Sequence, residues 1–239
     1  MVLDAQNMDS AALNRALRHC DGGCHVRNCL GQRHIGCGMA DRNITVSGTP
    51  GAMLGAFLHS GEITVLGNAQ DAVGDTMNGG RIVIHGNAGD AVGYAMRGGS
   101  IFVKGNAGYR AGIHMKQYGN MVPVLVIGGR AGSFLGEYQA GGILIVLGLH
   151  SDGNPIVSDF PCAGMYGGEV FLRGQWEDLD FPEQVTACRA EPKDLIQAEV
   201  QIRTFCRLFS LDPEQVLDGP FTRITPDSSN PYGRRYVKC

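Results

Sequence analysis

Charged and aromatic side chains that could do chemistry gather in two short stretches of the sequence, residues 109–118 and 137–138. The candidates there are Tyr109, Arg110, His114, Lys116, Glu137 and Tyr138. A histidine beside a glutamate can transfer protons near neutral pH, so His114 and Glu137 form a conceivable catalytic pair. Charges at a crowded bend need partners wherever they lie, so we favour a structural ion pair or a partner-binding patch.

Cysteines are the second source of possible chemistry. Four of the eight stand near the N-terminus: Cys20, Cys24, Cys29 and Cys37. Their spacings of four, five and eight residues match neither a zinc nor an iron–sulfur pattern. In a regular strand, Cys24 and Cys29 would also point to opposite faces. We predict no metal site here and leave the role of these four residues open. Four cysteines are expected to be small buried hydrophobic residues: Cys37, Cys162, Cys188 and Cys206.

Several reaction classes leave no sign in the sequence. It has no nucleotide-binding glycine loop, no H-E-x-x-H and no G-x-S-x-G motif. Removal of Met1 would expose Val2, which is not a nucleophile. A flavin-binding barrel needs about 250 residues by itself, so it does not fit in this chain. We therefore predict no catalytic, cofactor-binding or metal-binding residue in this chain.

Charge and hydropathy narrow the class of protein further. The net charge is −3, whereas nucleic-acid-binding domains usually carry a basic excess. No run of about 18 apolar residues predicts a membrane span. The start, Met1 to Asp4, lacks the basic and apolar regions of a signal peptide. We expect a cytoplasmic protein that binds neither nucleic acid nor membrane, and whose cysteines are free thiols or ligands rather than disulfides.

Glycine recurs at a fixed period along most of the chain. The 36 glycines in 239 residues are about twice the usual share. Successive members of one set are 19 residues apart, with a five-residue insertion after the fourth and a longer last unit: Gly48, Gly67, Gly86, Gly105, Gly129, Gly148 and Gly174. The residues four and two positions before each of these glycines are all apolar, from Ile44 and Val46 to Val170 and Leu172. This alternation indicates short strands with one face inward.

A unit of 19 residues is too short for a strand–helix–strand repeat, which needs about 30. It fits one coil of an all-β solenoid, a single-stranded β-helix in which equivalent residues of successive coils stack. Two sets should form such stacks inside: Met77, Met96 and Met115, and Val73, Val92 and Ala111. We divide the chain into an N-terminal helix and cap (1–30), the β-helix (31–174) and a helical and extended C-terminal tail (175–239).

Helices are expected only in the two flanks. Asp9 could cap a helix over residues 10–17 that covers the open first coil. A strand-like stretch, residues 24–37, should begin the solenoid. The apolar stripe over residues 193–209 predicts a helix, Asp212 to Glu214 marks the start of a short one, and residues 221–239 should be extended.

The outward positions of the strands change character along the solenoid. They are polar in the middle coils, at Glu62, Thr64, Arg81, Ser100 and Lys104. They are apolar in the later coils, at Val124, Val126, Ile143, Ile145 and Leu147. A solvated face should not be apolar, so something covers it. The C-terminal helix and another polypeptide are the two alternatives.

The repeated bends resemble those of the GXGXG domain of the glutamate synthase large subunit. The similarity rests on GNAQDAVGDTMNGG, GDAVGYAMRGG, GYRAGIHMK, GGRAGSFLGEY and GMYGGEVFLRG, and spans residues 32–174. The flanking residues 13–17 and 231–234 are similar to those of stand-alone versions, the archaeal-type glutamate synthase subunits and the small subunit of N-methylglutamate synthase. Formylmethanofuran dehydrogenase has a subunit that shares the repeat.

The resemblance implies a right-handed β-helix that carries no active site. It also implies partner chains: a glutamine amidotransferase subunit, an FMN-dependent glutamate synthase subunit and an iron–sulfur, NAD(P)H-oxidising subunit. Ammonia from glutamine would pass between them to 2-oxoglutarate, giving glutamate. FMN and iron–sulfur clusters would lie in those partners. The six candidate residues of this chain would lie at an interface or beside a tunnel.

Three alternatives remain at this level. One is a component of a molybdenum or tungsten complex of the formylmethanofuran dehydrogenase type. The second is a self-contained enzyme that uses His114 and Glu137. The third is a homo-oligomeric scaffold.

Overall fold

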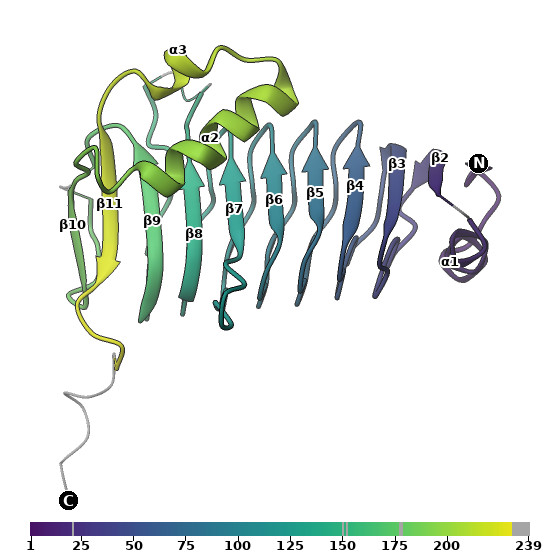
Figure 1. Ribbon diagram of the computed structural model, residues 1–239, viewed down its shortest axis with the longest axis horizontal. Coiled ribbons are helices and arrows are strands. Elements are labelled where there is room, and N and C mark those ends of the chain that lie inside the picture. Colours follow the sequence, from purple (N-terminus) through teal and green to yellow (C-terminus); the bar gives the residue numbers. More distant parts are fainter. Residues whose placement is uncertain (21, 150, 152, 177–178, 231–239) are drawn as a thin grey trace, which may run out of the picture.

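The computed structural model describes residues 1–20, 22–149, 151, 153–176 and 179–230 and shows a β-solenoid (Figure 1). Its elements in chain order are β1 (Val2–Asp4), α1 (Ser10–Arg18), β2 (Gly23–Leu30), β3 (Arg42–Thr49), β4 (Gly61–Val65), β5 (Arg81–Ile84), β6 (Ser100–Val103), β7 (Val124–Ile127), β8 (Ala140–Val146), β9 (Gly167–Arg173), β10 (Val185–Arg189), α2 (Ile196–Phe209), α3 (Pro213–Leu217) and β11 (Phe221–Pro226). The strands form one sheet in the order β1 to β9, then β11 and β10. The predicted fold class is confirmed.

Each coil contributes one strand to a parallel ladder along the long axis. Ile63, Ile82 and Ile101 lie in register, followed by Leu125, Leu144 and Val170. A second ladder of single bridges joins Ala69, Ala88, Ala107, Ala131 and Val157. The two predicted interior stacks are confirmed, since all six of their residues are fully buried. The interior is therefore filled with side chains.

The asparagines that follow the periodic glycines link neighbouring coils. The backbone N–H of Asn87 donates to Asn68 Oδ1, that of Asn106 to Asn87 Oδ1, and that of Arg130 to Asn106 Oδ1, each at 2.8 Å. Each side chain thus satisfies an N–H that the turn would leave without a partner. The asparagine of the G-N-A motif therefore has a structural role.

The N-terminal helix was correctly predicted to within one residue. The Asp9 side chain accepts a hydrogen bond from the backbone N–H of Ala12 at 2.7 Å and caps α1. Leu13 and Leu17 are buried against the first coil. The short strand β1, which pairs with β2, was not predicted.

The predicted opposite orientation of two cysteines in β2 is wrong. Cys24 and Cys29 are both buried, at 4% and 3% exposed. The register of β2 on β3 shifts between Val26 and Cys29, where Asn28 has φ +55°. This bulge adds a residue and returns Cys29 to the inner face. The prediction of burial fails instead for Cys188, which is exposed, and Cys37 is only partly buried.

The chain's own helix α2 covers the apolar outer face of the later coils (Figure 1). Ile202, Phe205 and Phe209 pack in one cluster with the outward residues of β5 to β9. This cover reaches two coils further toward the N-terminus than the sequence indicated, because it includes Val83 and Phe102. Of the two alternatives for this face, the C-terminal helix is the one observed.

The rest of the C-terminal region follows the predictions in part. Helix α2 begins at Ile196 rather than at 193, because residues 191–195 form a turn in which the Asp194 carboxylate accepts from the backbone N–H of Glu191. Helix α3 begins after Asp212, as predicted. Strand β11 is extended and pairs antiparallel with β9, but β10 was not predicted. Residues 231–234, which entered the resemblance, lie outside the described residues.

In the part of the chain that is described, no helix is long and apolar enough to cross a membrane.

Candidate functional site

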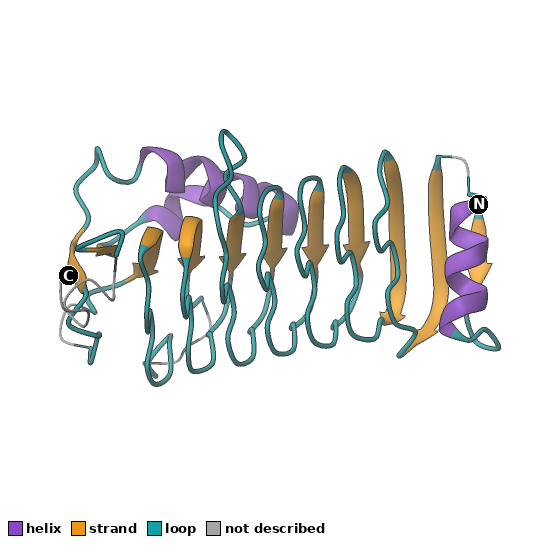
Figure 2. Ribbon diagram, turned by 90° about the horizontal axis from the view of Figure 1, so that it is seen from below, coloured by secondary structure: helices purple, strands orange, loops and turns teal. Residues whose placement is uncertain are grey.

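Five of the six candidate residues belong to turns, residues 109–114 and 133–138, and Lys116 follows the first of these turns by two residues. Figure 2 shows in teal the loops and turns that close each coil. In each bend, residues of positive φ alternate with ordinary ones, as at Arg110 (+57°), Gly112 (+72°) and His114 (+55°). The N–H groups of Arg110 and His114 donate to Ser133 and Glu137 of the next coil, at 2.9 Å each. The Gly112 N–H donates to Val92 of the preceding coil at 2.8 Å. Each bend is therefore bonded to both of its neighbours.

The central glycine of a bend has two reasons to be glycine. Its positive φ is one that other residues rarely adopt. At Gly112, a Cβ atom would also lie 2.4 Å from Leu144 Cδ1. The side chains of Arg110 and His114, two residues to either side, are exposed. In this bend the backbone thus directs two side chains outward, one on either side of the central glycine.

An ion pair joins two of the candidates. Arg110 Nε lies 2.9 Å from Glu137 Oε2, and the two side chains are 51% and 12% exposed. The Arg110 guanidinium also lies over the Phe134 ring, 5.2 Å from its centroid. Glu137 is thereby held by a cation, and it contacts His114 through the main chain.

Aromatic rings form two rows across the bends, which together we call the aromatic bend surface. The first row is Tyr109, Phe134 and Phe160, with centroids 6.0 and 5.3 Å apart. The second is Tyr94, His114 and Tyr138, with centroids 6.0 and 5.1 Å apart. Neighbouring coils lie about 4.8 Å apart, so rings at the same position or at adjacent positions of successive coils come within contact distance.

Much of the aromatic bend surface faces outward. Tyr94, Tyr109 and Phe160 are 38%, 50% and 59% exposed. The Tyr138 ring lies against Gly164 of the next coil, where a Cβ would come within 2.4 Å of it. Lys116 has an exposed side chain two residues after His114, and its N–H donates to Met96 O at 2.9 Å. Side-chain contacts thus join Tyr109, Arg110 and Glu137 in one group through Phe134, and His114 with Tyr138 in a second group. The main-chain bond from His114 to Glu137 links the two groups.

Three residues of this surface were not predicted from the sequence: Tyr94, Phe134 and Phe160. The signal was present, because Phe134 and Phe160 stand at the position of Arg110 in later coils. The spacings there are 24 and 26 residues. The first equals the spacing from Gly105 to Gly129, so Phe134 could have been found, whereas the extra residues of the last unit were not placed and hid Phe160.

A buried polar residue was missed as well. Gln139 occupies the interior position that holds Met115 in the preceding coil and Met165 in the next, and it is fully buried. Its Nε2 donates to Gly141 O and Gly142 O at 3.3 Å, while Oε1 has no hydrogen-bond partner. A glutamine at a methionine position of the repeat was the available signal.

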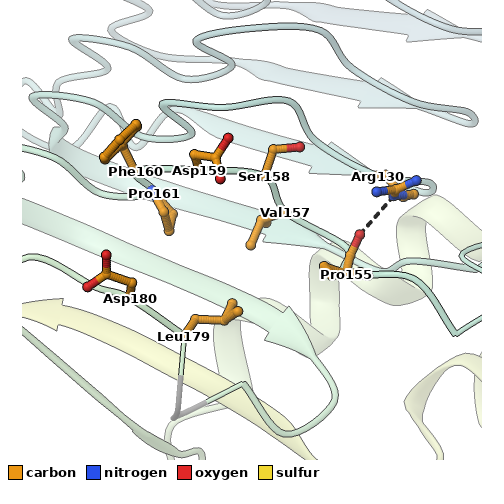
Figure 3. Close-up of a pocket in the computed structure, with 9 residues that line it drawn as sticks. All are labelled: Arg130, Pro155, Val157, Ser158, Asp159, Phe160, Pro161, Leu179 and Asp180. Carbon is orange, nitrogen blue, oxygen red and sulfur yellow. Dashed lines mark hydrogen bonds between the residues drawn. The ribbon is translucent and has the colours of Figure 1, made fainter.

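Groups of metal-binding side chains and hollows are the places where a cofactor could be held. No three His, Cys, Asp or Glu side chains there are grouped closely enough to hold a metal ion. A hollow of about 400 Å³ lies beside the last coil, with Arg130 at one end and Asp159 and Asp180 toward the other (Figure 3). Arg130 Nε donates to Pro155 O at 2.8 Å. None of the six candidate residues lines this hollow.

Comparison with known proteins agrees with the repeat. The family model described as GXGXG motif matches residues 6–219. An uncharacterized protein of Methanocaldococcus jannaschii, MJ1350, is 42% identical over 221 residues, which cover 89% of this chain and 84% of the relative.

Proposed function

Because the chain belongs to the GXGXG motif family, we propose that it is a non-catalytic subunit of a glutamate-synthase-like complex in the cytoplasm. In this proposal the solenoid holds an amidotransferase chain and an FMN-dependent synthase chain in register. Ammonia from glutamine then reaches 2-oxoglutarate, and the complex makes glutamate for nitrogen metabolism. FMN and iron–sulfur clusters belong to the partner chains, one of which oxidises NAD(P)H.

The aromatic bend surface is the observation that supports a docking role. The apolar strand face is covered by α2 of the same chain, so it offers no argument for a partner. The bend surface keeps three large aromatic side chains at least 38% exposed. Tryptophan, tyrosine and arginine are the residues that contribute most at protein interfaces. We place the partner contact there, with Arg110, Lys116 and Tyr138 as members.

The arrangement of His114 and Glu137 does not favour the enzyme alternative. The Glu137 carboxylate is engaged by Arg110, and the His114 ring stacks on Tyr138 at 5.1 Å. A general base must reach the proton that it removes, directly or through one water. Both groups instead contact neighbouring side chains of the same chain, so the pair is better explained as part of a structural or docking surface.

Purification of the tagged chain from its native cells, with mass spectrometry of the bound proteins, tests the proposal. We expect an FMN-dependent synthase chain and an amidotransferase chain to copurify. A triple variant, Tyr109→Ala with Phe134→Ala and Phe160→Ala, should reduce their recovery at least tenfold, since exposed aromatic anchors carry much of an interface's binding energy. Val200→Ala, at an exposed position on α2, is the matched control and should retain them.

Two outcomes would contradict the proposal. Copurification with a molybdenum or tungsten enzyme, and with no synthase or amidotransferase chain, would support the formylmethanofuran dehydrogenase type instead. Recovery of only further copies of this chain would support the homo-oligomeric scaffold.

A further inference from the structure

A pair of thiols lies at the N-terminal end of the solenoid, far in sequence from the bend surface. Cys20 follows α1 by two residues, and Cys24 lies at the start of β2. Their Sγ atoms are 2.8 Å apart, and the residues are only 1% and 4% exposed. A disulfide spans about 2.05 Å, so about 0.8 Å of further approach separates the sulfurs from bonding distance.

The other cysteine nearby does not belong to this pair. The Cys29 thiol donates to Gln32 Oε1 at 3.3 Å, and Gln32 in turn donates to Ala5 O at 2.9 Å. The described residues also place no third metal ligand beside Cys20 and Cys24. The geometry is therefore that of two sulfurs that face each other.

We propose that Cys20 and Cys24 are a modification site, at which a low-molecular-weight disulfide such as oxidised glutathione converts the two thiols to one intramolecular disulfide. In the first step the Cys20 thiolate attacks the small disulfide, forms a mixed disulfide and releases one small thiol. In the second step the Cys24 sulfur displaces the other small thiol from Cys20. The two cysteines lose two electrons and two protons, and the oxidant gains them as two thiols.

The order of attack follows from the environment of the two groups. Burial, followed by the hydrogen bond with Cys20, raises the pKa of Cys24 to about 12. Cys24 is thus a poor first nucleophile near neutral pH. The connection between the cysteines contains Gly22 and Gly23, which are exposed, and a Cβ at either one would meet nothing within 4 Å. In this proposal, a small oxidant reaches the pair on the side of these two exposed glycines.

The bond would fasten the end cap of the solenoid. Helix α1 covers the first coil through Leu13 and Leu17, and Asn14 Nδ2 donates to Arg33 O at 2.9 Å. A covalent link from the end of α1 to β2 keeps the helix beside the coil even when these contacts break. Oxidation therefore stabilises the open end of the core and leaves the bend surface unchanged.

Trypsin makes the test direct, because residues 19–27 form one tryptic peptide that contains both cysteines. The folded full chain is incubated with oxidised glutathione, quenched with acid, alkylated under denaturing conditions and digested. We expect the peptide to carry no alkyl group and to be lighter than its reduced form by two hydrogen atoms. Reduction before alkylation should restore two alkylated cysteines.

Cys188 provides the internal control, because it is exposed. If Cys188 becomes glutathionylated while residues 19–27 still take two alkyl groups, the proposal is wrong. It is equally wrong if the peptide stops at one glutathione and one free thiol. Chains with Cys188→Ser should behave as the unsubstituted chain does.

A stability measurement connects the bond to the cap. The oxidised chain should melt about 4–8 °C above the reduced one, as expected for a short loop in a chain of this length. The amides of α1 should exchange hydrogen more slowly after oxidation. Cys24→Ser should abolish both differences. Equal melting and equal exchange in the two redox states would refute a fastening role, and the peptide map stands even if the variant fails to fold.

Discussion

Two outer faces of this solenoid are built by the same repeat, but the apolar side chains of one are buried and those of the other are exposed. On the strand face, Val126 and Ile145 are fully buried because α2 lies over them. On the bend face, Tyr109 and Phe160 remain 50% and 59% exposed. An apolar row in a periodic sequence therefore does not by itself indicate a partner. What matters is whether the chain carries its own cover.

Substitution under the cover should have the largest effect. Phe205 is fully buried between α2 and the sheet, and its ring would come within 2.6 Å of a Cβ at Gly128. Phe205→Ala should lower the free energy of unfolding by about 3–5 kcal/mol, since it removes a buried ring and leaves a cavity. Urea denaturation measures this change. Val200→Ala on the exposed side of α2 should cost less than about 0.5 kcal/mol, and equal losses would mean that α2 does not cover this face.

The backbone of the bend should be the next most sensitive point. Gly112→Ala should cost about 2–4 kcal/mol, because it combines left-handed strain with a clash on Leu144. Gly119→Ala is the matched control, since Gly119 also has a positive φ of +59° but has nothing within 4 Å of its Cβ position. The control should cost only about 1 kcal/mol. Thermal or urea unfolding of both variants separates strain from crowding.

Removal of the buried polar atom should change stability in the other direction. Gln139→Met restores the residue type of the neighbouring coils and eliminates the Oε1 atom that lacks a partner. We expect a gain of about 1–2 kcal/mol in the free energy of unfolding, the usual scale for an unpaired buried polar group. A loss of stability would show that the two bonds from Nε2 outweigh the unpaired oxygen.

The exposed aromatic row should be the least sensitive in the isolated chain. Tyr109→Ala removes a half-exposed ring that contacts Phe134 and should cost less than about 1 kcal/mol. The same change should weaken partner recovery from cells. A large stability loss with unchanged recovery would assign this row to the fold rather than to docking.

The sequence determined the repeating interior almost completely. Each coil repeats the same apolar spacing, so the positions of Ile82 and Met77 follow from the period alone. The short terminal strands could not be found this way. Strand β10 has mostly exposed or partly exposed residues and forms because β11 offers it a pairing edge, which no local pattern encodes.

The candidate site was predictable only in part, for two physical reasons. At the cysteines, the bulge of β2 depends on Asn28 at φ +55°, and a single asparagine, although of a type enriched in the left-handed region, does not by itself predict a bulge. Insertions change the number of residues per coil without changing the stacking. The repeat already allowed for the insertion after Gly105 and so aligned Phe134 with Arg110, but the extra residues of the last unit were not placed and hid the equivalence of Phe160. Whether the six candidate residues meet a partner stays a prediction.

The hydrogen bonds that join each bend to both neighbouring coils keep the spacing between coils constant along the solenoid. Since every coil adds one strand spacing of about 4.8 Å, the number of coils fixes how far the capped end stands from any ring on the bends. Removal of one 19-residue unit would bring the capped end and a given ring closer by one strand spacing, and would leave the coils on either side of the deletion unchanged. The number of coils thus sets distances along the solenoid axis. Two proteins bound at different coils would be separated by the number of coils between them multiplied by the strand spacing.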